Sequence, residues 1–191
     1  MKRGPGSTSS MPRWAICFSV VLLGAAPGWA QERLTQEEAL RLAFPAPATI
    51  ERHTAYLDER QLAEASALAG PDGELGQRVV TYYVGAYGGR AIGAAYFDGH
   101  IVRTRSEVAM IVVNPDGRVR QVEILRFDEP PEYRASVPWI AQLNGKELNW
   151  RLSLKGDVLN LTGASLTSRA LVRATRRVLA LHRVINPISG R

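Results

Sequence analysis

Residues 79–127, VVTYYVGAYGGRAIGAAYFDGHIVRTRSEVAMIVVNPDGRVRQVEILRF, decide the fold of this chain. Runs rich in β-branched and aromatic residues predict strands over residues 79–86, 92–97, 106–113 and 119–127. The runs are divided by the turn signals Gly88-Gly89, Asp98-Gly99 and Asn114-Pro115-Asp116-Gly117. Because connections this short join antiparallel neighbours, whereas a parallel crossover needs about a dozen residues or more, the stretch predicts an antiparallel sheet.

Helices and one further strand are expected before this sheet. Thr35 and Glu38 have the spacing of a capping box, which predicts a short helix that the following prolines stop. Residues 49–57 alternate loosely and predict a strand. Asp58 is a suitable N-cap for a second helix, which ends at Gly70.

A long amphipathic helix is predicted after the sheet, beginning at Ala164. At about 100° per residue, one line along this helix is formed by Leu171, Thr175, Val178, His182 and Ile185. The opposite side carries Arg169, Arg173, Arg176, Arg177 and Arg183. We expect those arginines to form a solvated face and His182 to pack in the core. The predicted fold class is therefore α+β, with one domain over residues 31–191 in which helices flank an antiparallel sheet.

The composition narrows the possible chemistry. A chain of 191 residues with 46% hydrophobic and 22% charged residues is typical of one folded globular domain. Its single cysteine, Cys17, lies in an N-terminal apolar run, and the chain has only three histidines. If that run is removed, thiol nucleophiles, thiolate metal sites and disulfides are all excluded from the mature protein.

The N-terminus has the pattern of a secretory signal over residues 1–30. Lys2, Arg3 and Arg13 precede an apolar run over residues 14–26, and small residues precede a cleavage point after Ala30. This predicts an exported, periplasmic protein, with an uncleaved membrane anchor as the alternative. Cleavage removes three basic residues and lowers the net charge from +6 to +3. Much of the basic character therefore belongs to the signal, and we expect no nucleic-acid partner.

A hydroxyl-rich segment precedes the terminal helix: Thr162-Gly163-Ala164-Ser165-Leu166-Thr167-Ser168. Free backbone N–H groups and the positive end of the helix dipole make such a position suitable for an anion. The small Gly163 and Ala164 allow a bulky group to approach the backbone. The plain alternative is that Thr162 or Ser165 serves only as the N-cap of the helix.

The same segment resembles the Ser/Thr-Gly-Ala-Thr-Leu-Thr-Ser signature of the FMN-binding domain family, which includes the periplasmic flavin subunits of the Rnf and sodium-pumping NADH:quinone reductase complexes. The resemblance covers about residues 74–182. It includes Asn114-Pro115-Asp116-Gly117, Glu129-Pro130-Pro131-Glu132-Tyr133, Trp139 and Gln142-Leu143-Asn144-Gly145-Lys146. In that family a flavin transferase joins FMN by a phosphoester to the hydroxyl residue after the Gly-Ala pair, which is Ser165 in this sequence.

The resemblance implies an electron carrier that passes electrons between membrane or periplasmic redox partners and has no substrate of its own. The implied FMN-binding residues are Thr162, Gly163, Ala164, Ser165, Leu166, Thr167, Glu132, Tyr133, Trp139 and Lys146. Of these, Glu132 and Tyr133 are expected to face the isoalloxazine ring, Trp139 to flank it, and Lys146 to place positive charge near it. The alternative roles are a loop end for Glu132 and Tyr133, a core position for Trp139, and a helix stop at Lys146.

Two positions depart from the family pattern. The family has threonine where this chain has Ser165, and commonly aspartate where it has Leu159. These departures keep open an exported binding module of the same fold that has lost the flavin. Asp128, Glu129 and Glu132 leave a paired-carboxylate hydrolase as a further alternative, because the sequence does not give their separation.

Overall fold

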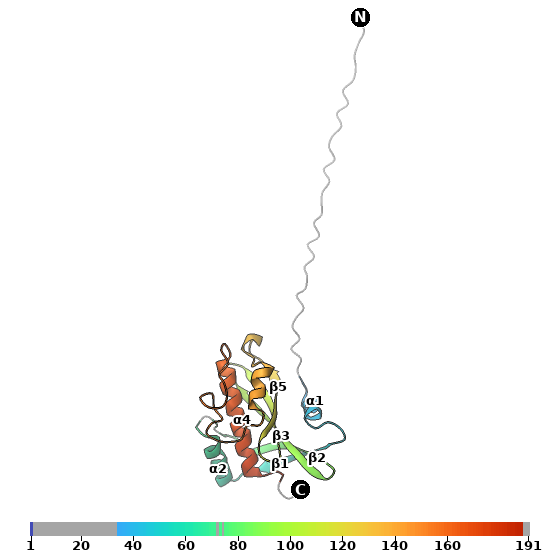
Figure 1. Cartoon of the computed structure of the whole chain (residues 1–191), viewed down its shortest axis with the longest axis vertical. Coiled ribbons are helices and arrows are strands. Elements are labelled where there is room, and N and C mark those ends of the chain that lie inside the picture. The colour runs from blue at the N-terminus through green and yellow to red at the C-terminus, as the bar shows by residue number, and fades with distance from the viewer. Residues whose placement is uncertain (2–33, 72, 74, 189–191) are drawn as a thin grey trace. The chain divides into compact units, whose positions relative to one another are not determined.

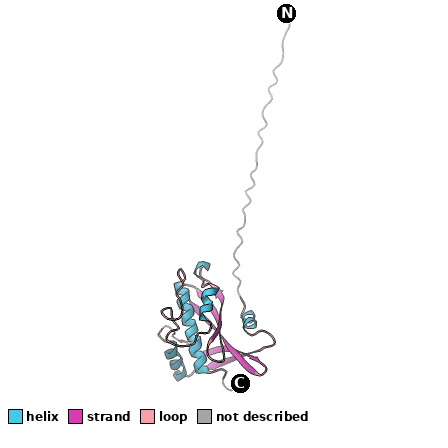
Figure 2. Ribbon diagram, viewed as in Figure 1, coloured by secondary structure: helices cyan, strands magenta, loops and turns pink. Residues whose placement is uncertain are grey.

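Five antiparallel strands form one sheet in the order β1-β2-β3-β4-β5, as predicted (Figures 1 and 2). Their bounds are β1 Thr49–Tyr56, β2 Val79–Tyr87, β3 Arg90–Ile101, β4 Ser106–Val113 and β5 Val119–Phe127. The computed structural model describes residue 1 and residues 34–71, 73 and 75–188, so the predicted signal over residues 1–30 lies outside the described residues except for Met1.

The β2–β3 connection is the tight turn that its glycines predict. Gly88 and Gly89 have φ angles of 58° and 75°, in the left-handed region where a side chain is disfavoured. Two such residues in succession match the twist of a two-residue hairpin.

The prediction of a turn at Asp98-Gly99 was wrong. Both residues lie inside β3, where Asp98 pairs with Ala109 and Gly99 with Val108 of β4. The strand continues because the carboxylate of Asp98 is bound by His100 and Arg177, which compensates the polar group for its burial. The chain instead turns in the loop over residues 102–105, where Val102 donates a backbone hydrogen bond to Arg105.

Helices cover both faces of the sheet (Figure 1). Their bounds are α1 Gln36–Ala43, α2 Glu59–Ala69, α3 Val137–Ile140 and α4 Ser165–Ile185, with short 3-10 helices η1 Pro131–Tyr133 and η2 Ala141–Leu143. The predicted capping box at Thr35 of α1 and the predicted N-cap at Asp58 of α2 are both present, and Asp58 forms a capping box as well. Within the part of the chain that the structure describes, none of the helices combines the length and the apolar character needed to cross a membrane.

Alternate residues of the central strands enter two separate cores. Ala94 and Tyr96 of β3 face the cluster that contains α4, whereas the intervening Ala95 packs with α1. The α1 side includes Phe44, whose ring lies directly against Gly85 of β2, so that any larger residue at this position would collide with it. The sheet is therefore buried on both sides at its centre.

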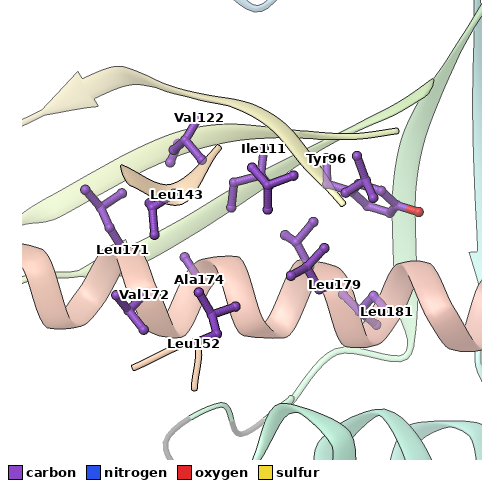
Figure 3. Packing of buried hydrophobic residues seen from close by; sticks show 14 of the residues in the cluster. Tyr96, Ile111, Val122, Leu143, Leu152, Leu171, Val172, Ala174, Leu179 and Leu181 are labelled. Carbon is purple, nitrogen blue, oxygen red and sulfur yellow. The ribbon is translucent and has the colours of Figure 1, made fainter. Parts of the chain in front are cut away.

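The main core lies between the sheet and α4 (Figure 3). Leu171 and Leu179 of α4 point toward the sheet, which contributes Ile111 and Val122. On the other side of the helix, Leu152 of the long loop before α4 packs close to Val172. This arrangement buries α4 on two sides.

The predicted solvated arginine face of α4 is only partly present. Arg169 and Arg183 are exposed, but Arg176 and Arg177 are half-buried and bonded to the protein. Arg176 donates to the carbonyl oxygens of Ala69 and Asn149, at 2.7 Å each. A pattern of charge cannot separate a solvated arginine from one that binds buried carbonyls, because both occupy the side away from the apolar stripe.

Candidate functional site

The loop before α4 leaves the first turn of the helix open. Ala164 is the N-cap, and no side chain among the described residues caps the helix through a hydrogen bond. Gly163 has a φ of 85° and open space where a Cβ would stand. The alternative that Thr162 or Ser165 serves only as the N-cap is therefore wrong, because Ala164 holds that position and Ser165 is the first helical residue. The first backbone N–H groups of α4 remain available to an external acceptor.

The hydroxyl groups of the segment divide into two kinds. Thr167 and Ser168 are buried, and each donates to a carbonyl oxygen: Thr167 Oγ1 to Tyr133 at 2.5 Å, and Ser168 Oγ to Ala164 at 2.9 Å. Thr162 is exposed, whereas Ser165 is half-buried. Ser165 Oγ makes only long contacts of 3.3 Å, with the Leu161 carbonyl and the Asn160 amide. Ser165 is thus the loosely held hydroxyl at the helix start.

A cavity of about 190 Å³ opens at this helix start. It is lined by Arg103, Tyr133, Gly163, Ala164, Ser165, Leu166 and Thr167. The structure therefore brings together Tyr133 and five residues of the predicted segment, from separate parts of the chain. Thr162 lies next to these residues in the chain without lining the cavity.

Arg103 is the lining residue that sequence reasoning missed. It lies in the loop between β3 and β4, and its guanidinium carbon stands 4.5 Å from the centroid of the Tyr133 ring. Such a stack holds a cation at a defined place beside the cavity. A lone arginine in a loop carries no sequence signal of this position, because the contact depends on the packing of the loop against η1.

Glu129 is the acceptor that organises the same loop. Its Oε1 accepts hydrogen bonds from the backbone N–H groups of Arg103, Thr104 and Arg105, at 3.2, 2.7 and 2.9 Å. These bonds, that of Thr104 above all, hold the pKa of Glu129 below its ordinary value. The carboxylate is thus occupied by backbone groups and is not free to act as a general acid, which opposes the paired-carboxylate alternative.

Trp139 is in the core and does not line the cavity at the helix start. Its side chain is 4% exposed, and Nε1 donates to the Leu159 carbonyl at 2.6 Å. The amide of Leu159 donates to Gln142 Oε1 at 3.0 Å. Trp139 and Gln142 therefore hold Leu159, in the loop that leads to Ser165. The position of Trp139 agrees with the alternative in which it is a core residue.

Glu132 and Lys146 also lie outside this cavity. Glu132 is exposed on η1. The Lys146 carbonyl accepts from the amide of Val119 at 2.8 Å, which ties the end of η2 to β5. Neither side chain is brought to Ser165 by the described residues, so their predicted contacts remain predictions.

A second cavity of about 240 Å³ adjoins the first through their shared residue Leu166. It is lined by His100, Ile101, Val102, Leu166, Arg169, Ala170, Arg173 and Arg177. The basic side chains of Arg169, Arg173 and Arg177 therefore line this cavity along α4, from its first turn toward its middle.

A buried ionic cluster borders this second cavity. Arg177 binds both carboxylate oxygens of Asp98, at 2.6 and 3.0 Å, and His100 Nδ1 lies 2.9 Å from Asp98 Oδ1. His100 Nε2 lies 3.5 Å from the fully buried Glu107. Burial disfavours the imidazolium, but the hydrogen bond with Asp98 and the nearby carboxylate of Glu107 raise the pKa of His100 to about 9. Burial raises the pKa of Glu107.

The residues at the helix start fit a phosphate ester of moderate size. A phosphate needs hydrogen-bond donors and positive charge, which the open helix turn and Arg103 supply. A bulky substituent on that phosphate needs an uncrowded approach, which Gly163 leaves open. A hydroxyl within the same cavity, Ser165, allows the phosphate to be held by a bond as well as by contacts.

Two comparisons with known proteins found a similarity to this chain. Residues 105–180 match the model of the family described as the FMN-binding domain, within the predicted range of residues 74–182. The fold is similar to the crystal structure of NqrC from Shewanella oneidensis, with a TM-score of 0.54 over 83% of this chain and 92% of that one, at 13% sequence identity. No curated protein matches the chain in sequence.

Proposed function

We propose that this chain, whose residues 105–180 match the FMN-binding domain family, is an exported electron-transfer flavoprotein whose FMN is esterified to Ser165. The match to the family supports FMN as the cofactor and electron transfer as its use. The covalent bond and the periplasmic location go further than the match and are proposals.

The observation that carries the covalent proposal is the state of Ser165. It is the first residue of α4, it lines the cavity, and it has only long hydrogen bonds through Oγ. Thr167 and Ser168 are committed to carbonyl oxygens in the interior. Of the two hydroxyl groups that line the cavity, those of Ser165 and Thr167, a modifying enzyme can therefore reach that of Ser165 at the smaller structural cost.

The attachment is a simple phosphoryl transfer. The Oγ of Ser165 forms a bond to the phosphorus of the FMN group, and a phosphoanhydride bond of an activated flavin nucleotide breaks. The proton of Oγ passes to the departing nucleoside monophosphate. The protein gains one FMN less one water, and no electrons are exchanged in this step.

A covalently attached flavin is an advantage for a protein that works outside the cytoplasm. A dissociable cofactor there is lost by dilution, whereas a tether keeps the ring at the protein whatever the free concentration. FMN supplies the electron chemistry when bound, and this chain supplies its position and access to it. The proposed partners are the flavin transferase and redox proteins of the membrane or the periplasm.

One alternative is favoured by a specific observation. Leu159, at the place of the family aspartate, is 74% exposed, and the nearby Asp157 is held by Arg151 at 2.7 Å. No carboxylate of the described residues therefore replaces the missing one at that position. A protein of this fold that has lost its flavin, and that binds partners without it, is the second candidate.

Visible colour after denaturation separates the two candidates. The full chain is co-expressed with a flavin transferase, purified, unfolded in guanidinium chloride and separated from free flavin. We expect the flavin absorbance to stay with the protein, to vanish in Ser165→Ala, and to persist in Ser165→Thr and in the control Thr162→Ala. Protein without flavin in all four samples would favour the second candidate.

A further inference from the structure

We propose that Arg103 is the residue that recognises the phosphate of FMN, and that Glu129 positions it by fixing the loop between β3 and β4. This inference rests on the proposed function. It names the residue through which the protein binds FMN in preference to riboflavin, which lacks the phosphate. Arg103 precedes the range matched by the family model, so the match itself does not point to it.

Arg103 has no ion-pair partner among the residues that the structure describes. In contrast, other arginines of the described residues, such as Arg41 and Arg177, do form ion pairs with carboxylates. The guanidinium of Arg103 instead lies over the Tyr133 ring, at 4.5 Å, and lines the same cavity as Ser165. A stacked arginine still has N–H groups in its plane to donate to an anion.

The loop that carries Arg103 is held by one buried carboxylate. Glu129 is 6% exposed and accepts three backbone N–H groups and the Thr104 hydroxyl through Oε1. An ionised acceptor makes stronger hydrogen bonds than a neutral one, so the negative charge of Glu129 stiffens the loop. Glu129 does not line the cavity and acts only through Arg103.

The α4 side of the cavity is also connected to the loop that carries Arg103. Thr167 Oγ1 of α4 donates to the carbonyl of Tyr133, the residue on which Arg103 stacks. The helix start, η1 and the β3–β4 loop are therefore joined through Tyr133. A phosphate at Ser165 then meets a cation whose position is set in advance.

This arrangement distinguishes FMN from riboflavin. The two flavins share the ring and the ribityl chain and differ in the phosphate. A guanidinium aimed at the phosphate contributes to binding of FMN and contributes nothing comparable for riboflavin. Loss of one hydrogen bond to a charged group corresponds to roughly a tenfold change in the dissociation constant.

The test measures both flavins with protein that cannot form the ester. Full-length Ser165→Ala protein, free of flavin, is titrated with FMN and with riboflavin, followed by flavin fluorescence. The same titrations are made with four double variants, in which the Ser165→Ala parent also carries Arg103→Ala, Arg103→Lys, Glu129→Gln or Arg105→Ala. Arg105 is the matched control, because it is an exposed arginine of the same loop that does not line the cavity.

We expect Arg103→Ala to weaken FMN about tenfold and to leave riboflavin within about twofold. Arg103→Lys should recover part of the loss, Glu129→Gln should weaken FMN alone by a smaller factor, and Arg105→Ala should behave as the parent. In Ser165 protein, Arg103→Ala should also slow transferase-dependent flavin incorporation relative to Arg105→Ala.

The assignment of Arg103 would be overturned if Arg103→Ala lowered the affinities for FMN and riboflavin equally. It would also be overturned if Arg103→Ala and Arg105→Ala lowered the affinity for FMN equally. Loss of both flavins in Glu129→Gln would overturn the positioning role of Glu129. If wild-type protein becomes loaded with flavin while Arg103→Ala changes neither affinity nor incorporation, this inference fails and the proposed function stands. If wild-type protein gains no flavin and the parent binds neither compound, both fail.

Discussion

His100 is held between two carboxylates in the interior of the protein. Asp98 lies 2.9 Å from one ring nitrogen and Glu107 lies 3.5 Å from the other. Burial works against ionisation of Asp98, but hydrogen bonds from His100 and Arg177 lower its pKa to about 2. The folded protein therefore binds the proton of His100 more tightly than the unfolded chain does.

This proton makes the stability depend on pH. The pKa of His100 is about 9 in the folded protein against an ordinary value of 6.5. The stabilisation is fully present below pH 6.5 and is lost as the pH rises through about 9, because the folded state then releases a proton that the unfolded state has already lost. Urea unfolding should show a loss of roughly 3 kcal/mol over this window. His100→Gln should show a much smaller pH dependence there, and an unchanged slope in that variant would contradict the assignment.

Thr167 connects the start of α4 to η1 through one hydrogen bond. Its hydroxyl is buried and donates to the Tyr133 carbonyl at 2.5 Å. Thr167→Val keeps the shape and leaves that carbonyl unpaired, so we expect urea unfolding to show a loss of about 1–2 kcal/mol. The exposed Thr162→Val is the control and should change stability by less than about 0.5 kcal/mol. Equal effects of the two substitutions would show that the bond to Tyr133 has no special weight.

At the scale of elements, α4 holds the molecule together by its polar side as well as its apolar one. Arg176 bonds to carbonyl oxygens of Leu68 and Ala69, at the end of α2, and of Asn149 and Leu152, in the loop before α4. It thereby closes two segments onto the helix that carries Ser165. A guanidinium is suited to this task because its donors spread in a fixed plane.

Arg176→Gln should therefore destabilise the protein although it changes a residue on the polar face. Loss of several carbonyl partners predicts a decrease of about 2–3 kcal/mol in the free energy of unfolding. Arg183→Gln, on the same helix and exposed, should change it by less than about 0.5 kcal/mol. Similar values for both variants in thermal and urea unfolding would restore the interpretation of a simple solvated face.

The elements were predictable where local patterns determine them. The capping box at Thr35, the N-cap at Asp58, most of the strands with their turns, and the apolar stripe of α4 all express short-range periodicity or hydrogen bonding. The predicted turn at Asp98-Gly99 is absent, because an ion pair between Asp98 and Arg177 of α4 overrides the turn preference of these two residues. Local propensity gives no information about such a partner.

At the scale of the whole molecule, the candidate site is assembled from three distant parts of the chain. The α4 segment was predictable from its motif, because its residues are contiguous. Arg103 and its support by Glu129 were not, because they reach the cavity only through the packing of the β3–β4 loop and η1. Trp139 was quoted in the motif, yet its burial and its bond to Leu159 follow from the fold alone.

The central claim is that the chain carries FMN as an ester of Ser165, and the most direct measurement is the mass of the peptide that contains this residue. Protein from cells that express the flavin transferase is digested with trypsin, which cuts after Lys155 and Arg169. We expect the peptide over residues 156–169 to be heavier by one FMN less one water, and fragmentation to place the added mass on Ser165. An unmodified peptide, or a flavin on Thr162 or Thr167, would contradict it.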